Sequence, residues 1–167
     1  MPFHALSTIP NGSNVFLDAN VLIYGLGAGS AECVALLRRC AQEEVIGITS
    51  FHIISEVTHR LMIEEAKSKG LAGAQARKTL NDHPDRVRKL VDYWKDIERL
   101  LSLNLLVLTV DEDIIRGAQR ERTGYGLLNN DSLTIACMRL CGISMLASRD
   151  TGFEHVSNIV VFSPTDL

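Results

Sequence analysis

The sequence predicts an α/β fold with a mainly parallel five-stranded sheet. Short apolar runs alternate along the chain with longer segments of helical periodicity, which is the pattern of parallel strands joined by helical crossovers. The chain has 167 residues, a length typical of one domain. Its 46% hydrophobic and 22% charged residues are typical of a folded, soluble globular protein and exclude disordered, collagen-like and coiled-coil classes.

Each predicted strand is a short apolar run that suits burial on both faces of a sheet. The runs are VFL from Val15, VIGI from Val45, LLVL from Leu105, ISML from Ile143 and IVVF from Ile159.

Helices are predicted between these runs. The segments after Ser30 and Ser50 carry apolar residues at helical spacing, and each serine is placed to cap the first turn. A further amphipathic helix is predicted from Pro84 to Leu103. Turn-forming residues in 67–84 join it to the preceding helix, so residues 67–103 form an extended helical middle segment within a single domain, 1–167.

The formal charge of −3 excludes a basic surface over the whole molecule, so any contact with nucleic acid must be local. Residues 60–89 are an exception, with eight basic against four acidic residues and a net charge of +4. The four cysteines form no CxxC pair and are expected to be buried, reduced thiols (Cys33, Cys40, Cys137 and Cys141). The sequence has no signal-peptide pattern and no apolar stretch of membrane-spanning length, so a cytoplasmic location without membrane contact is expected.

Four acidic residues map to one edge of the predicted sheet. Asp18 and Asp150 follow the first and fourth strands, and ligands of parallel sheets bind at the carboxyl ends of strands. Glu56 lies on the polar face of the helix after the second strand, and Asp131 lies at the start of a helix that Gly142 closes. Taken singly, each has a local explanation as a helix cap, a solvated helix face or a turn residue.

Together, four carboxylates on one edge would repel one another and raise each other's pKa values. A hard divalent cation such as Mg²⁺ or Mn²⁺ relieves this repulsion, because it binds carboxylate and water oxygens. The five histidines form no HExxH pattern, which disfavours a zinc hydrolase.

Three segments resemble the PIN-domain family of metal-dependent nucleases, which includes the toxin ribonucleases of toxin–antitoxin pairs. They are LDANVLIY around Asp18, SEV around Glu56 and NNDSLTIACMRLCGISMLASRDTGF around Asp131 and Asp150. The resemblance implies a three-layer α/β/α sandwich and a Mg²⁺- or Mn²⁺-dependent endoribonuclease, with RNA as substrate and an antitoxin protein as partner. It implies Asp18, Asp131 and Asp150 as metal ligands and Glu56 as ligand or orienting base. Asn20, Asn130 and Ser148 are the implied supporting residues.

The chain departs from the family pattern at three places. Many members carry another acid where this chain has Gly152, and its loss removes an extra ligand for a second metal ion. Ser148 replaces the usual threonine but keeps the hydroxyl. The helical segment 67–103 is longer than in the compact toxins, and it offers a surface for a homodimer.

Arg116, Arg120 and Arg122 precede Asp131 and are candidates for holding RNA phosphates near the metal. The alternative is a solvated helix face shared with Asp113 and Glu121. A lone tyrosine, Tyr125, has the chemistry to stack on a base, but it is more often an ordinary loop residue.

Two other functions stay open at this stage. One is a non-catalytic PIN fold that serves as an interaction or scaffold subunit. The other is an aspartyl-phosphate phosphatase of the HAD type, which is disfavoured because such enzymes need a second acid where this chain has Asn20. The sequence leaves open which RNA is cut, whether DNA is cut and whether one or two metal ions bind.

Overall fold

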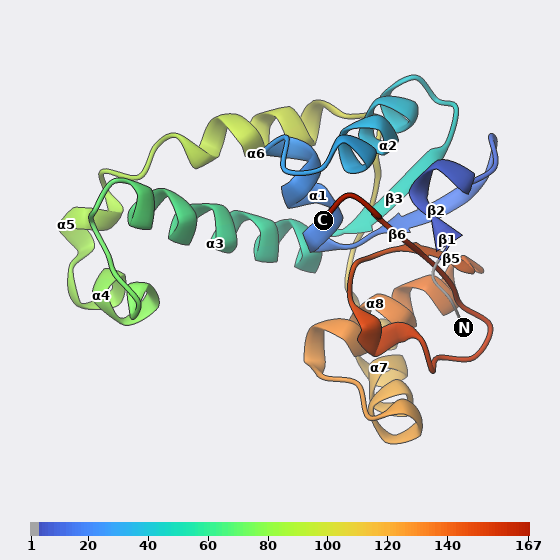
Figure 1. Cartoon of the computed structure of the whole chain (residues 1–167). Helices are drawn as coiled ribbons and strands as arrows, with labels where there is room; N and C mark the ends of the chain where they lie inside the picture. The colour runs from blue at the N-terminus through green and yellow to red at the C-terminus, as the bar shows by residue number, and fades with distance from the viewer. Residues whose placement is uncertain (1–3) are drawn as a thin grey trace.

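A computed structural model describes residues 4–167 and contains a parallel sheet of six strands (Figure 1). The strand order is β1-β6-β5-β2-β3-β4. The strands are β1 (His4–Ala5), β2 (Asn14–Leu17), β3 (Ile46–Ser50), β4 (Leu106–Leu108), β5 (Met145–Ala147) and β6 (Val160–Ser163). The five predicted strands are therefore present. The sixth, β1, pairs with β6 at His4 and Phe162 and is too short, at two residues, to show an apolar run.

Helices cover both faces of the sheet. They are α1 (Ala19–Leu26), α2 (Ala31–Ala41), α3 (Phe51–Ser68), α4 (Ala76–Asp82), α5 (Pro84–Val87), α6 (Tyr93–Ser102), α7 (Glu112–Tyr125) and α8 (Asn129–Leu140), with short 3₁₀ turns η1 (Leu6–Thr8) and η2 (Thr151–Phe153). Helices α1, α2 and α3 lie on one side and the packed pair α7 and α8 on the other (Figure 1). This is the expected three-layer arrangement.

The chain order reverses between β2 and β5, which are neighbours in the sheet. The chain runs from β2 outward through β3 to β4, then returns to β5 on the other side of β2. Leu17 pairs with Ala147 across this boundary, so the two strands end side by side. In parallel sheets the crevice beyond such a reversal is the usual place for a ligand. The strand cores beneath it are fully buried, including Phe16 and Leu146.

One of the two predicted serine caps is present. The Ser30 hydroxyl accepts a hydrogen bond from the Cys33 amide (3.0 Å), as a capping serine does. The prediction for Ser50 was wrong: it precedes α3, but its hydroxyl pairs with His52 Nδ1 (2.7 Å) and caps no amide. The side chain of His52, two residues later, binds this hydroxyl instead, and the sequence pattern does not predict that contact.

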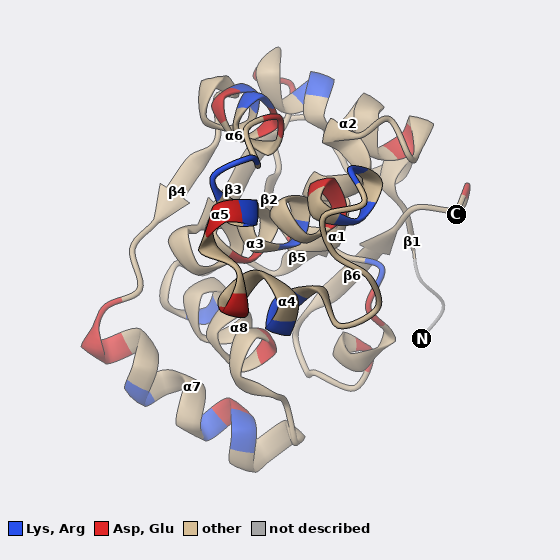
Figure 2. Ribbon diagram, turned by 90° about the vertical axis from the view of Figure 1, so that its left-hand side faces the viewer, with Lys and Arg blue, Asp and Glu red and all other residues tan. Residues whose placement is uncertain are grey.

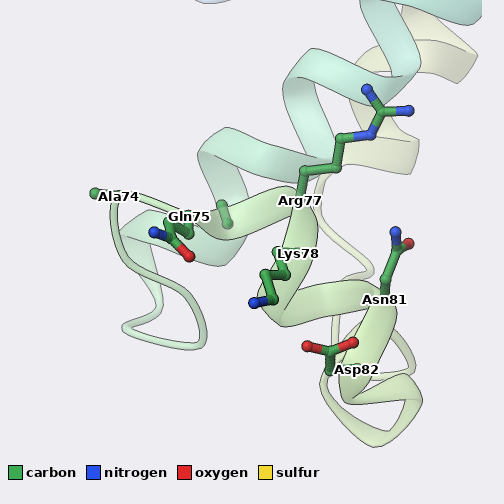
Figure 3. A pocket seen from close by; sticks show the side chains of 7 residues that line it. Ala74, Gln75, Arg77, Lys78, Asn81 and Asp82 are labelled. Carbon is green, nitrogen blue, oxygen red and sulfur yellow. The ribbon is translucent and has the colours of Figure 1, made fainter.

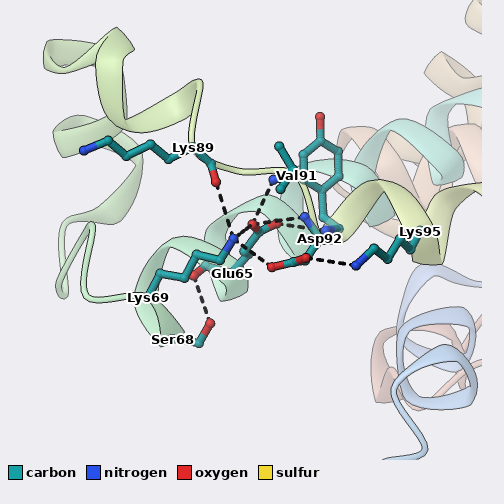
Figure 4. Close-up of polar contacts among 8 residues, drawn as sticks. Glu65, Ser68, Lys69, Lys89, Val91, Asp92 and Lys95 are labelled. Atoms are coloured by element: carbon teal, nitrogen blue, oxygen red, sulfur yellow. Dashed lines mark hydrogen bonds and ion pairs between the residues drawn. The ribbon is translucent and has the colours of Figure 1, made fainter.

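The predicted helix from Pro84 to Leu103 is broken into α5 and α6. The cause is Glu65 on α3, whose buried carboxylate accepts hydrogen bonds from the amides of Val91 (2.9 Å), Asp92 (3.1 Å) and Tyr93 (2.8 Å) (Figure 4). Lys69 Nζ lies 2.5 Å from the same carboxylate. The first amides of a helix have no partner within the helix, and Glu65 supplies one for those at the start of α6. These bonds therefore favour the start of a new helix at this position.

Three of the four cysteines are buried as free thiols, whereas Cys141 is exposed, contrary to expectation, because it follows the last turn of α8. Burial raises the pKa of Cys40 and of Cys137 to about 11, so both stay protonated. Within residues 4–167, no single helix is long and apolar enough to cross a membrane; the pair α1 and α2, bent by 96°, passes that test only when the two are combined.

Candidate active site

Asp18 lies at the point where β2 gives way to α1, directly beyond the β2–β5 boundary. Its Oδ1 accepts the Ala19 amide (2.7 Å), so its local role is the N-cap of α1 and not that of a turn residue. Its Oδ2 accepts two further bonds, from Asn20 Nδ2 (2.7 Å) and from the Ser148 hydroxyl (2.6 Å). The carboxylate therefore joins the ends of two neighbouring strands.

The segment after β5 completes this chain of hydrogen bonds. Ser148 is fully buried, and its oxygen also accepts the Asp150 amide (3.0 Å). Asn20 Oδ1 accepts the Arg149 amide (3.0 Å). Because Asn20 contacts both Asp18 and the backbone after β5, it fixes the distance between the two acidic segments.

Asp150 is exposed beside Asp18, and its Oδ1 accepts the Gly152 amide (2.7 Å). A Cβ atom at Gly152 would lie 3.0 Å from that oxygen, tighter than ordinary contact. Glycine at this position therefore leaves room for the Asp150 carboxylate, and the acid that many family members carry here would have to displace it.

Glu56 lies in the second turn of α3 and is bound across the crevice by α8. Asn130 Nδ2 donates to Glu56 Oε2 (2.8 Å), and Arg60 Nη1 lies 3.9 Å from Oε1. Asn130 thus positions Glu56 next to the first turn of α8, where Asp131 is the following residue. The structure brings these two predicted residues together.

Asp131 is the one acid of the four whose carboxylate has no hydrogen-bond partner among the described residues. It is half-buried in the first turn of α8, yet the N-cap position belongs to Leu128. Among residues 4–167, no side chain or amide donates a hydrogen bond to its carboxylate, so the capping alternative for Asp131 was wrong. A half-buried carboxylate without a donor is costly unless another charge compensates for it.

Two of the four carboxyl groups, Asp18 and Asp131, have raised pKa values. Burial, followed by the charges of Asp150, Asp18 and Glu56, raises the pKa of Asp131 to about 6. Burial is also the largest cause of the raised pKa of Asp18, with Glu56 and Asp150 adding to it and the Ser148 hydrogen bond opposing it. The four side chains from four segments thus form one anionic cluster, which we call the acidic cluster (Asp18, Glu56, Asp131 and Asp150).

The side-chain atoms that the acidic cluster offers to a metal ion are of the kind that a hard divalent cation prefers. Every candidate ligand atom is oxygen, and the nearby Asn20, Asn130 and Ser148 add neutral polar groups. In the conformation described for residues 4–167, no three Asp, Glu, His or Cys side chains converge closely enough to hold an ion. Oxygens of Asp18, Asp150 and Glu56 are bonded to their own neighbours instead, so binding requires these side chains to turn toward Asp131.

His52 lies under the acidic cluster and links two of its elements. Its Nδ1 contacts the Ser50 hydroxyl (2.7 Å) and its Nε2 the Thr134 hydroxyl (3.2 Å), which joins α3 to α8. Burial lowers the pKa of His52, against the opposing effect of Glu56, so the ring is neutral at pH 7. Both ring nitrogens are occupied, so the histidine is a brace between the helices that carry Glu56 and Asp131.

The family model of the PIN domain matches residues 15–159 of this sequence, from β2 to the start of β6. The chain belongs to the PIN-domain family.

Individual relatives of this PIN domain agree in length and fold. Ribonuclease VapC6 of Methanocaldococcus jannaschii is 27% identical over 154 residues, which cover 89% of this chain and 96% of that protein. The crystal structure of VapBC2 from Rickettsia felis, bound to a DNA fragment from its promoter, contains a chain with a TM-score of 0.58 at 14% identity, covering 90% of this chain and 98% of that one. VapC20 of Mycobacterium tuberculosis, a Sarcin-Ricin loop cleaving toxin, has a TM-score of 0.56 at 17% identity, covering 86% and 95%.

The three arginines predicted to hold RNA all lie on α7. The alternative prediction, a solvated helix face that they share with Asp113 and Glu121, is only partly correct. Arg116 pairs with Glu112 (2.9 Å) and Arg122 donates to Asn129 (2.8 Å), whereas Arg120 is exposed. Glu121 was wrongly placed on that face: it is buried and pairs with Arg139 (2.9 Å). Contact of these arginines with RNA stays a prediction.

Tyr125 ends α7 and is packed rather than free to stack on a base. Its hydroxyl is hydrogen-bonded to Ser157, His155 bonds to its carbonyl oxygen (2.7 Å), and the Arg139 guanidinium lies 5.8 Å from its ring centroid. The expectation of an ordinary loop residue was wrong as well, because Tyr125 is the last residue of α7.

Sequence reasoning missed Arg149, a cation between Ser148 and Asp150. Its guanidinium lies 5.8 Å from the Tyr24 ring centroid and donates to the Tyr24 hydroxyl (3.1 Å), instead of neutralising the acids beside it. Its position in the strand-end segment was a usable signal, because its neighbours Ser148 and Asp150 were both singled out.

Proposed function

We propose that this PIN domain is a Mg²⁺- or Mn²⁺-dependent endoribonuclease and the toxin of a toxin–antitoxin pair. The observation that carries the proposal is the acidic cluster: four carboxylates from four segments lie at one edge of the sheet, where burial and the charges of Asp150, Asp18 and Glu56 together raise the pKa of Asp131 to about 6. Membership of the PIN family and the likeness to a curated ribonuclease support the reaction class.

Asp18, Asp131 and Asp150 would hold the ion, with Glu56 as a ligand or as the base that orients water. A bound divalent ion lowers the pKa of water and neutralises charge on the phosphoryl group during hydrolysis. Asn20 and Ser148 hold Asp18 toward the strand-end segment of Asp150. Asn130 holds Glu56 beside Asp131, which leaves one Glu56 oxygen free of the asparagine to accept a proton.

The antitoxin partner is supported by the relatives, whose solved structures include a toxin–antitoxin complex from Klebsiella pneumoniae with a TM-score of 0.57 at 19% identity. We therefore expect expression of the wild type without an antitoxin to arrest growth, and expression of Asp18→Asn not to.

The test of the reaction uses purified protein, labelled RNA and Mg²⁺ or Mn²⁺. Wild type is compared with the near-isosteric variants Asp18→Asn and Asp131→Asn, and with Asp113→Asn, which removes an exposed acid on α7. We expect metal-dependent cleavage by the wild type and Asp113→Asn, and a loss of at least about 100-fold in both cluster variants, since metal catalysis needs these ligands. Cleavage that survives both cluster substitutions, or none by folded wild type with either metal, overturns the proposal.

A further inference from the structure

A second feature of the molecule lies away from the acidic cluster. We call it the arm: residues 60–92, comprising the C-terminal part of α3, then α4, α5 and the segment that leads into α6. In Figure 1, α3 and α6 lie side by side and extend away from the sheet, with α4 and α5 at their far end. The arm has a small hydrophobic cluster of its own around Ala66, Leu80 and Leu90, separate from the main core.

The arm concentrates positive charge on a molecule that is negative elsewhere. The arm carries eight basic and five acidic residues, a net charge of +3, whereas the chain as a whole carries −3. With the arm toward the viewer, Figure 2 shows basic residues on α4 and on the segment between α5 and α6. A local field of this kind attracts polyanions even when the net charge of the protein does not.

Most of these cations are not needed to hold the arm together. Lys69 is bound by Glu65 and Asp92, and Arg86 donates to the Leu71 carbonyl oxygen (2.8 Å), so both have structural roles. Five others are exposed and, within residues 4–167, have neither an ion pair nor a side-chain hydrogen bond: Lys67, Arg77, Lys78, Arg88 and Lys89. These five charges are therefore available to a ligand.

Two of the five line a hollow at the tip of the arm. It has a volume of about 430 Å³ and is lined by residues 74–78 together with Asn81 and Asp82. Figure 3 shows the Arg77 and Asn81 side chains extending from the same side of α4, with Asp82 below them. The amides of Gln75 and Asn81 beside two cations suit a sugar–phosphate backbone, which presents hydroxyls and anionic oxygens together.

The arm is joined rigidly to the acidic cluster by α3. Glu56 belongs to the cluster, Arg60 lies one turn farther on the same face, and Lys67 lies a further two turns along. At 1.5 Å per residue, Lys67 is about 16 Å along the helix axis from Glu56, and α4 lies beyond it. A polyanion that reaches from the cluster to the hollow must therefore be several phosphates long.

We propose that the arm binds the phosphate backbone of the RNA substrate at a second contact, several nucleotides from the cut. This inference rests on the proposed function and deepens it, because it selects long or structured RNA over short oligonucleotides. Lys67, Arg77 and Lys78 contact phosphates, and the hollow receives the backbone between them. An acidic protein would be the other ligand for such a surface, but the continuity of the arm with Glu56 favours the substrate itself.

The test measures binding separately from cleavage. The full chain with Asp18→Asn is titrated against a fluorescein-labelled RNA hairpin in EDTA at several salt concentrations, with and without Arg77→Gln and Lys78→Gln together. A matched pair, Arg38→Gln with Lys95→Gln, removes the same charge from exposed residues outside the arm, of which Lys95 pairs with Asp92 at the arm's edge (3.3 Å). The arm pair should weaken binding roughly tenfold and lower the slope of log affinity against log salt by about 1.5, as two lost phosphate contacts predict, whereas the matched pair should change little.

Equal effects of the two pairs would overturn the proposal, as would competition by poly-glutamate as strong as that by unlabelled RNA. Melting temperatures of both pairs are measured to verify folding. If wild type cleaves RNA but the arm pair binds like the matched pair, the arm proposal fails and the ribonuclease stands. If the arm pair loses affinity but wild type cleaves nothing, the ribonuclease fails and the arm remains an RNA-binding surface.

Discussion

Replacing Glu65 with glutamine tests whether a buried carboxylate on α3 builds the arm. In the wild type its side chain is 7% exposed and accepts hydrogen bonds from three backbone amides and from Lys69. Burial is the largest single effect on the pKa of Glu65 and raises it. The four hydrogen bonds together outweigh burial, so the pKa falls from 4.5 to about 2. Glutamine keeps the shape but loses the charge and places an NH₂ group against amides that need an acceptor.

The magnitude follows from the pKa. At about 1.4 kcal/mol per unit, the shift corresponds to at most about 3.5 kcal/mol. Because the Lys69 side chain is 34% exposed, solvent screens part of this, and we expect a loss of about 2 kcal/mol confined to the arm. Since the folded pKa is depressed, this stabilisation is present above the unfolded value near 4.5 and is lost as the pH falls through about 2.

Hydrogen exchange of the amides of Val91, Asp92 and Tyr93 measures this effect locally. We expect exchange to be about 30-fold faster in Glu65→Gln than in the wild type, as a loss of about 2 kcal/mol requires. The matched control is Glu64→Gln, which changes the exposed neighbour on α3. Equal protection of the three amides in the wild type and Glu65→Gln would refute this account of the helix break.

Three further predictions concern the acidic cluster and the core. Mn²⁺ affinity, measured by electron paramagnetic resonance of free Mn²⁺, should fall as the pH drops through about 6, because the raised pKa of Asp131 leaves its carboxyl protonated there; a flat profile between pH 5 and 7.5 would contradict this. Gly152→Ala should strengthen Mn²⁺ binding severalfold, because the new Cβ would lie 3.0 Å from Asp150 Oδ1 and disfavour the bond to the residue 152 amide that Asp150 must leave to reach the ion; unchanged affinity would show that Asp150 is not confined. Gly47→Ala should cost about 1 to 3 kcal/mol in urea unfolding, since its Cβ would lie 2.6 Å from a Leu105 methyl; wild-type stability would show that the core yields there.

The sequence predicted those parts of the fold that depend on local patterns. Apolar runs located five strands, and the strand ends placed Asp18 and Asp150 beside each other, as the pairing of Leu17 with Ala147 shows. Ser30 was recognised as a cap because capping involves residues only three positions apart. These features need no knowledge of distant contacts.

Features set by distant contacts were not predictable. The break between α5 and α6 depends on Glu65, which is more than twenty residues earlier in the chain, and the periodicity of residues 84–103 continues through it. Ser50 was assigned as a cap because the link from His52 to Thr134 on α8 is invisible in the sequence. Glu121 has the composition of a surface residue, and only the packing of α7 on α8 shows that it is buried with Arg139.

The same distinction holds for the candidate site. Spacing and strand ends identified the four acids, but their local roles differ in ways that the sequence does not show. Asp18 caps the helix α1 and Asp150 caps the 3₁₀ turn η2, whereas Asp131 does not cap α8. The partnership of Asn130 with Glu56 joins residues 74 positions apart and follows only from the fold.

The central claim is that four carboxylates from distant segments act as one anionic site for a divalent ion. A carboxyl-resolved NMR titration of Asp131 tests it most directly. We expect a midpoint near pH 6 in the wild type. The midpoint should be lower in Asp150→Asn and in Asp18→Asn, and addition of Mg²⁺ should also lower it in the wild type. A midpoint near 4 that neither the substitutions nor Mg²⁺ move would contradict it.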